Sequence, residues 1–132
     1  MASTSKFATE PNSTTTSGHS SAIGAKKVIG THVKNASGEK LGSIEDIILD
    51  KLSNNIMFAV CGFGGFLGMG EKHHAIPWRL LKYDKNQDGY VVNLTEAQLK
   101  AAPADIAELM RGDATAFRDR AYEYYKETKY WW

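Results

Sequence analysis

Residues 28–63, with the sequence VIGTHVKNASGEKLGSIEDIILDKLSNNIMFAVCGF, contain three short apolar runs separated by turn-forming residues. These runs predict strands at residues 28–33, 40–50 and 56–63, because strands of an all-β unit are short and are bounded by Gly, Asn, Asp and Ser. Between the first two runs, Asn35 opens a turn in which Gly38 is free to take a positive φ angle. We expect the first two strands to form a hairpin.

The third run, residues 56–63, is apolar at both odd and even positions. A strand covered on only one side alternates apolar and polar residues, so this run predicts a central strand that is covered on both sides. The glycine-rich stretch 62–70 permits sharp bends, and apolar runs at 73–81 and 90–94 flank a turn at 84–89. Together these segments predict a mainly β protein, a small closed β-barrel of five or six strands.

The two ends of the chain differ from this middle part. The first 25 residues are rich in Ser and Thr and poor in large apolar side chains, which predicts a disordered tail. After residue 94 the pattern becomes helical: Thr95 and Gln98 form a predicted capping box, and Asp113 is placed to cap a later helix. We therefore expect a tail at 1–25, a barrel domain at 26–94 and a helical extension at 95–132.

Charge and hydropathy exclude several classes of function. The chain has 132 residues, with 16 basic and 15 acidic side chains and a formal net charge of +1. No segment carries the basic surplus that nucleic-acid binding needs. The N-terminus has no apolar h-region, and nowhere do about 18 consecutive apolar residues occur. We therefore expect neither a signal peptide nor a membrane span, and we expect a cytoplasmic location.

The side chains that commonly bind metals or perform redox chemistry are few. Cys61 is the lone cysteine, and its apolar neighbours predict a buried thiol rather than a reactive one. His73 and His74 are adjacent in a predicted strand, where neighbouring side chains point to opposite faces. They therefore predict no zinc site.

Four stretches of the sequence, in this order, resemble the signature of the PRC-barrel domain family. They are VIG at 28–30, NASGEKLGSIEDIILD at 35–50, GGFLGMGEKH at 64–73 and AIPW at 75–78. The resemblance spans residues 27–94. It implies a small β-barrel similar to the cytoplasmic domain of the photosynthetic reaction-centre H subunit and to the C-terminal domain of the ribosome maturation factor RimM, both of which dock onto other macromolecules. The family has no shared catalytic residues, so the resemblance implies no enzymatic activity.

Two groups of residues are candidates for such docking. Phe66, Leu67 and Met69 lie among glycines and either project as an apolar docking loop or plug the end of the barrel, and we favour the plug. The C-terminal region is dense in aromatic residues, as binding hot spots are, yet its aromatic stripe is equally suited to pack back on the barrel. Its candidate interaction residues are Phe117, Tyr124, Tyr125, Trp131 and Trp132.

From these features we predict a non-catalytic protein-interaction or self-assembly module. The expected partner is another protein or a second copy of the chain, and we expect a homo-oligomer. No nucleophile and base, paired carboxylates or cofactor motif can be assembled from the sequence. Neither catalytic residues nor cofactors are therefore expected.

Residues 84–89, DKNQDG, match the first half of a calcium-binding loop, in which Asp84, Asn86 and Asp88 supply oxygen ligands. The twelfth position of such a loop requires a bidentate Glu, and this chain has Thr95 there. A plain hairpin turn is favoured, because turns need the same residue types. A small-ligand or calcium-binding barrel that uses this turn is the alternative function.

Overall fold

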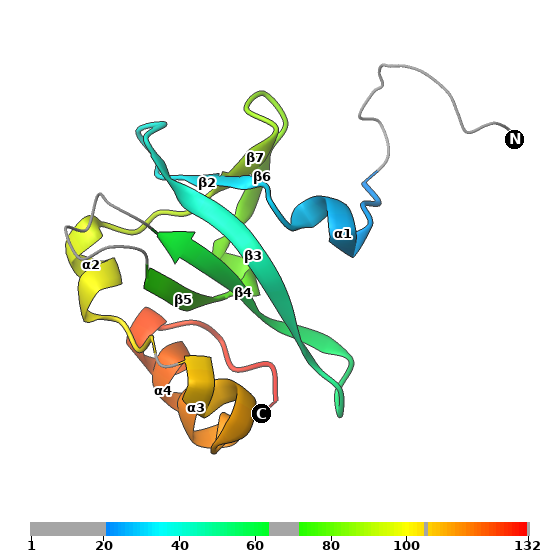
Figure 1. Cartoon of the computed structure of the whole chain (residues 1–132), viewed down its shortest axis with the longest axis vertical. Helices are drawn as coiled ribbons and strands as arrows, with labels where there is room; N and C mark the ends of the chain where they lie inside the picture. Colours follow the sequence, from blue (N-terminus) through cyan, green and yellow to red (C-terminus); the bar gives the residue numbers. More distant parts are fainter. Residues whose placement is uncertain (1–20, 64–71, 105, 132) are drawn as a thin grey trace, which may run out of the picture.

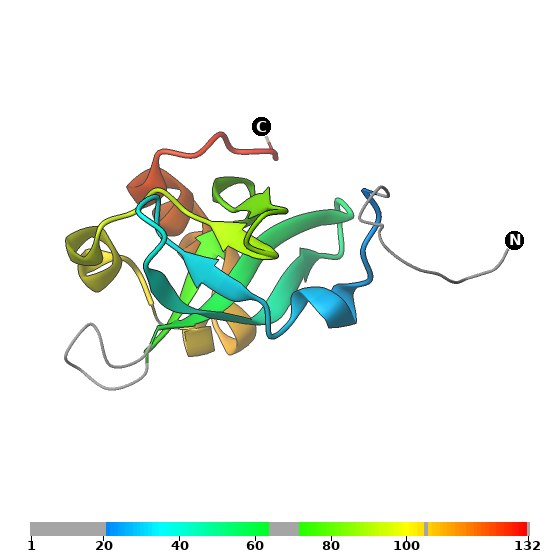
Figure 2. The same ribbon diagram turned by 90° about the horizontal axis from the view of Figure 1, so that it is seen from above.

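The computed structural model describes residues 21–63, 72–104 and 106–131, which form one six-stranded sheet with short helices around it (Figure 1). The elements in chain order are α1 (Ala25–Val28), β2 (His32–Lys34), β3 (Lys40–Asp50), β4 (Asn55–Phe63), β5 (Lys72–Pro77), the 3-10 helix η1 (Trp78–Leu80), β6 (Lys82–Asp84), β7 (Gly89–Val91), α2 (Glu96–Ala101), α3 (Ile106–Arg111) and α4 (Ala114–Tyr125). The predicted mainly β class is confirmed. Seen from above, α1 and α2 lie at opposite ends of the molecule (Figure 2).

The strands lie in the order β5-β4-β3-β2-β7-β6. Neighbouring strands run antiparallel except β2 and β7, which pair in parallel. The long strand β3 occupies the predicted residues 40–50 and pairs with both β2 and β4. The predicted first hairpin is therefore confirmed.

The chain before β2 differs from the predicted strand at 28–33, because α1 ends at Val28 and β2 begins only at His32. The reason is Gly30, whose φ angle of 95° lies in the left-handed region and interrupts the extended backbone. The Gly30 N–H donates a hydrogen bond of 2.6 Å to the carbonyl oxygen of Ile44, and Val28 is buried in the core. These contacts hold α1 against the sheet.

The sheet does not close on itself, so the predicted closed barrel is wrong in this respect. β5 and β6 are the two edge strands. β5 ends at Pro77, which has no N–H to donate, and the chain then forms η1 rather than continuing as a strand. β6 has only three residues, which pair with β7.

β4 is buried on both faces, as its sequence predicts. Ala59, Cys61 and Phe63 pack into an inner cluster with residues of β2, β3 and β7. Phe58 belongs to a different, outer cluster and is fully buried there. Because successive side chains of a strand point to opposite faces, β4 separates two hydrophobic layers.

The outer cluster is closed by α4. Phe117 and Tyr122 pack edge-to-face on Phe58, with ring centroids 5.9 and 5.5 Å from its own, and Ala121 is buried in the same cluster. The buried Tyr122 hydroxyl donates a hydrogen bond of 2.8 Å to the carbonyl oxygen of Met57. Burial raises the pKa of Tyr122 to about 12. The C-terminal helix is thus a layer of this fold.

The predicted helix caps are present. The Thr95 side chain accepts from the Gln98 N–H, and the Gln98 side chain accepts from the Thr95 N–H, which completes the capping box of α2. Asp113 caps α4 by accepting from the Ala116 N–H. Within the described ranges, no helix has the length and apolar character needed to cross a bilayer.

We predict that Gly42→Ala lowers the free energy of unfolding by about 2–3 kcal/mol. A Cβ atom at this position of β3 would collide with the carbonyl oxygen of Gly62 and would lie 2.8 Å from the Cδ1 atom of Phe63. Urea denaturation measures the effect. Gly24→Ala is the control, because a Cβ there meets nothing within 4 Å, and equal losses in the two variants would contradict the close approach of β3 and β4.

Candidate interaction surface

Seven large hydrophobic side chains are exposed in the part of the chain that the structure describes. They are Ile23, Ile29, Leu49, Leu52, Ile56, Tyr83 and Met110. Single exposed apolar residues are normal on protein surfaces, whereas groups of them mark contact sites. Three of the seven come from the β3–β4 hairpin, and this group includes Leu52, whose side chain is 95% exposed.

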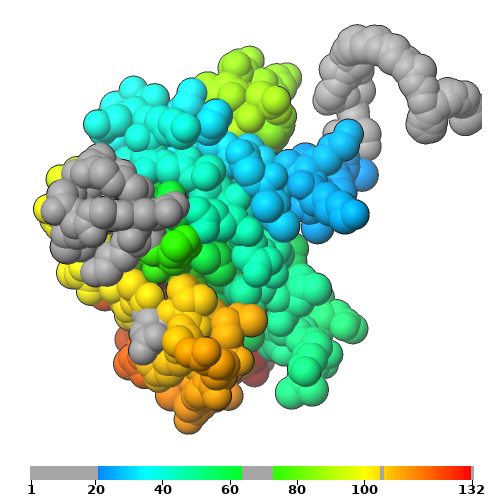
Figure 3. Space-filling view, in the orientation of Figure 1, coloured from blue at the N-terminus to red at the C-terminus, as the bar shows by residue number. Residues whose placement is uncertain are grey.

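We name Leu49, Leu52 and Ile56 the hairpin patch. Leu49 and Ile56 are partners in the register of β3 and β4, and Leu52 lies in the turn between the two strands. Directly opposite side chains of antiparallel strands lie side by side on one face. The end of the hairpin projects from the body of the molecule (Figure 3). The patch therefore lies on a projecting part of the molecule, and Ile56 at its base also lines a hollow of about 180 Å³.

Polar groups hold the turn that presents Leu52. The Asp50 carboxylate accepts hydrogen bonds of 3.0 Å from the Leu52 N–H and 3.4 Å from the Ser53 N–H. Asn54 takes a φ angle of 65°, which its short polar side chain tolerates, and its N–H donates to the Asp50 carbonyl oxygen. The turn does not need the Leu52 side chain.

No sequence pattern singled out this patch. The available signal was a leucine at a turn position that usually takes a polar residue.

The C-terminal segment forms a hydrogen bond with the base of this turn. The Tyr130 hydroxyl donates a 2.7 Å hydrogen bond to Oδ2 of Asp50, 80 residues earlier in the chain. This bond lowers the pKa of Asp50, and burial together with the same bond raises the pKa of Tyr130. The guanidinium of Arg118 lies 3.6 Å from the ring centroid of Trp131, which packs on Tyr130. The hairpin end is thus tied to α4 and to the segment that follows it.

The predicted aromatic interaction residues serve this internal packing. Phe117, on the buried face of α4, is fully buried, and Tyr125 is half-buried against the inner cluster. The Tyr124 hydroxyl donates a 2.7 Å hydrogen bond to the carbonyl oxygen of Gln98. Trp131 is half-buried between Arg118 and the rings of Tyr122 and Tyr130. The remaining predicted interaction residues, Phe66, Leu67, Met69 and Trp132, lie outside the described residues.

The two carboxylates of the predicted calcium loop, Asp84 and Asp88, accept hydrogen bonds within their own hairpin. Asp84 accepts from the Asn86 N–H at 2.9 Å and from the side-chain amide of Gln87 at 2.9 Å. Asp88 accepts from the Tyr83 hydroxyl at 2.9 Å and has a φ angle of 48°, a conformation that Asp tolerates in tight turns. These are the interactions of a hairpin turn between β6 and β7.

His73 and His74 lie in different environments, and His74 is the register partner of Cys61 across β4 and β5. Nε2 of His73 lies 2.6 Å from a carboxylate oxygen of the exposed Glu45, whereas His74 is buried against the ring of Phe63. Burial raises the pKa of the Cys61 thiol to about 12, so the reactive thiolate is disfavoured. Across the described ranges, no three His, Cys, Asp or Glu side chains meet in a group suited to a metal ion.

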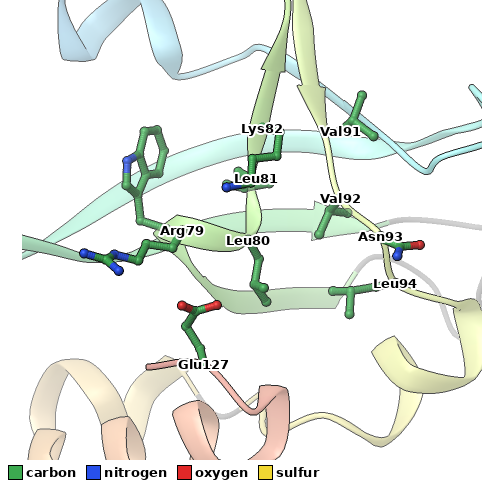
Figure 4. Close-up of a pocket in the computed structure, with 10 residues that line it drawn as sticks. Arg79, Leu80, Leu81, Lys82, Val91, Val92, Asn93, Leu94 and Glu127 are labelled. Carbon is green, nitrogen blue, oxygen red and sulfur yellow. The ribbon is translucent and has the colours of Figure 1, made fainter. Parts of the chain in front are cut away.

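A cleft of about 700 Å³ lies between η1–β6 and the chain that follows β7 (Figure 4). Leu80 and Leu94 approach it from its two sides, with Glu127 below them (Figure 4). Arg79 and Lys82 add two cations to its lining. The charged groups of its lining are thus two cations and the carboxylate of Glu127.

The family model of the PRC-barrel domain matches residues 21–99 of this chain. The match includes the whole six-stranded sheet and α1, together with the capping box of α2. No curated protein matches the sequence.

We predict that Tyr130→Phe lowers the free energy of unfolding by about 1 kcal/mol at pH 7, because it removes a part-buried hydrogen bond to a charged group. Because the folded-state pKa of Asp50 is lowered, this contribution is present above the unfolded pKa near 3.8 and is lost as the pH falls through the folded value. Denaturation of both proteins at pH 7 and in acid measures the difference.

Tyr124→Phe is the matched control for this prediction. Its hydroxyl donates to a backbone carbonyl, which does not titrate, so its loss should have the same effect at both pH values. An equal pH dependence in the two variants would show that Tyr130 does not act through the Asp50 carboxylate.

Proposed function

This chain belongs to the PRC-barrel family, and from that premise we propose that it is a non-catalytic self-assembly module that binds a second copy of itself through the hairpin patch. The observation that supports the proposal is the exposure of Leu49, Leu52 and Ile56 on a turn that polar groups already hold. Each Å² of apolar surface removed from water contributes roughly 25 cal/mol. Covering the patch therefore favours association.

A second copy of the chain is a favourable partner on electrostatic grounds. The formal net charge is only +1, so two copies repel each other little, and proteins near zero net charge associate readily. Three side chains provide less than the roughly 800 Å² that each partner buries in a stable complex. The proposed association is accordingly weak and reversible.

The chemistry of the described side chains supports a role without catalysis. The Cys61 thiol is buried and its pKa is raised, which disfavours its use as a nucleophile. The exposed His73 faces a carboxylate rather than a group that it would activate. The proposed location is the cytoplasm, which keeps a lone cysteine such as Cys61 reduced.

We expect sedimentation velocity of the full chain to show a mass that rises with protein concentration. Leu52→Ser should weaken this association about tenfold, because it removes an apolar side chain from the contact without touching the core. Met110→Ser is the control, since Met110 is another exposed hydrophobic residue, at 58%, but lies on α3 outside the patch. The proposal fails if the wild-type chain stays monomeric at every concentration, or if Leu52→Ser associates as strongly as the wild type.

A further inference from the structure

A second surface with exposed apolar side chains, whose lining is mixed polar and apolar, lies near the N-terminal end of the described chain. Ile23, Ile29 and Tyr83 are 54%, 42% and 53% exposed, and all three line a single hollow of about 510 Å³ between α1 and the β6–β7 hairpin. Its lining also includes Tyr90, which is buried in the core. We name this hollow the α1 groove. With the hairpin patch, it accounts for six of the seven exposed large hydrophobic side chains.

The groove is fixed by contacts on both of its walls. On one wall, the buried Val28 and the hydrogen bond from the Gly30 N–H to Ile44 hold α1 and the following residues to the sheet. On the other wall, Tyr83 is the register partner of Tyr90 and packs on it with ring centroids 5.6 Å apart. The Tyr83 hydroxyl is bonded to Asp88. The hollow is therefore preformed, which lowers the entropic cost of binding.

We propose that the hairpin patch of one copy inserts into the α1 groove of the next copy. This inference rests on the proposed self-assembly and names the surface that receives the patch. The exposed tip of the patch is aliphatic, and the groove is a hollow lined by two isoleucines and two tyrosines together with the polar residues Lys27, Thr31, His32 and Asp88. Seating one in the other covers the exposed apolar groups of both surfaces at once, so more area is removed from water than when two projecting tips meet.

The charges around the two surfaces are compatible with this contact. Lys51 is exposed beside Leu52 on the tip, and the rim of the groove carries the exposed carboxylate of Asp88. The other charged or titratable groups of the groove are Lys27 on α1 and His32 on β2. A seated tip can place Lys51 toward Asp88 and away from Lys27, which would fix the orientation of the contact.

The two surfaces lie in different parts of the molecule. In Figure 1 the turn of the β3–β4 hairpin is at the lower end of the view, whereas α1 and the β6–β7 hairpin are in its upper half. A copy that binds through its tip keeps its own groove free. That groove either receives the partner's tip about a two-fold axis, which closes a dimer, or receives the tip of a third copy, so that a ring or an open chain grows.

Complementing variants of the full chain test this contact by sedimentation velocity. Leu52→Asp places a charge on the tip, and Ile23→Asp places one in the groove; both positions are more than half exposed, so the fold should be retained, which thermal melting checks. Each variant alone should associate at least about tenfold more weakly than the wild type. An equimolar mixture retains one intact tip and one intact groove, and we expect it to form a dimer that does not grow further.

Ile29→Asp provides a second groove variant and should behave as Ile23→Asp does. Met110→Asp is the control for an added charge elsewhere, and it should assemble as the wild type does. If the groove variants assemble normally while Leu52→Asp does not, copies meet through their tips, and the groove inference is wrong although the proposed function stands. A mixture that stays monomeric also contradicts the inference. If Leu52→Asp assembles normally, the proposed function itself is wrong.

Discussion

The burial of β4 on both faces is the constraint on which the rest of the structure depends. Its inner side chains fill the core of the sheet, but Phe58 points the other way and is fully buried. A fully buried aromatic residue removes a large apolar area from water, so the outer face needs a covering layer. α4 supplies that layer through Phe117, Ala121 and Tyr122. A chain that ended before α4 would leave Phe58 uncovered.

This constraint also determines which apolar surfaces are left for binding. The aromatic residues at the C-terminus match the composition of binding hot spots, yet those that the structure describes pack on Phe58, on Arg118 or on one another. Among the described residues, the large apolar side chains that stay exposed lie in the hairpin patch and the α1 groove, with Met110 apart from both. Tyr130 links the packed aromatic residues to the exposed turn, because its hydroxyl donates a hydrogen bond to Asp50 at the base of that turn.

Local sequence patterns predicted much of the sheet and its helix caps. The strand at 40–50, the covered strand β4, and the caps at Thr95 and Asp113 each depend on residues close together in the chain, so periodicity and capping rules suffice. The signature of the PRC-barrel family gave the class of fold in the same way. These features required no knowledge of contacts between distant segments.

The features that sequence reasoning missed depend on distant contacts. The prediction of a first strand at residues 28–33 was wrong around Gly30. This residue has a positive φ angle, and its N–H donates a hydrogen bond to Ile44 on another strand. The prediction of a closed barrel was wrong because the two edge strands do not pair: β5 ends at Pro77, and β6 is only three residues long. The hairpin patch was missed because alternation predicts a face for Leu49 and Ile56 but does not show that no strand or helix covers it.

Native-state hydrogen exchange on the full chain tests most directly whether α4 is a layer of the fold that β4 requires. If it is, amides of α4 at residues 117–122 and of β4 at residues 57–63 should exchange with the same free energy of opening, close to that of global unfolding, because neither layer stays buried without the other. Exchange of the α4 amides at a free energy more than about 2 kcal/mol below that of β4 would contradict this, since the helix would then open while the sheet remained folded.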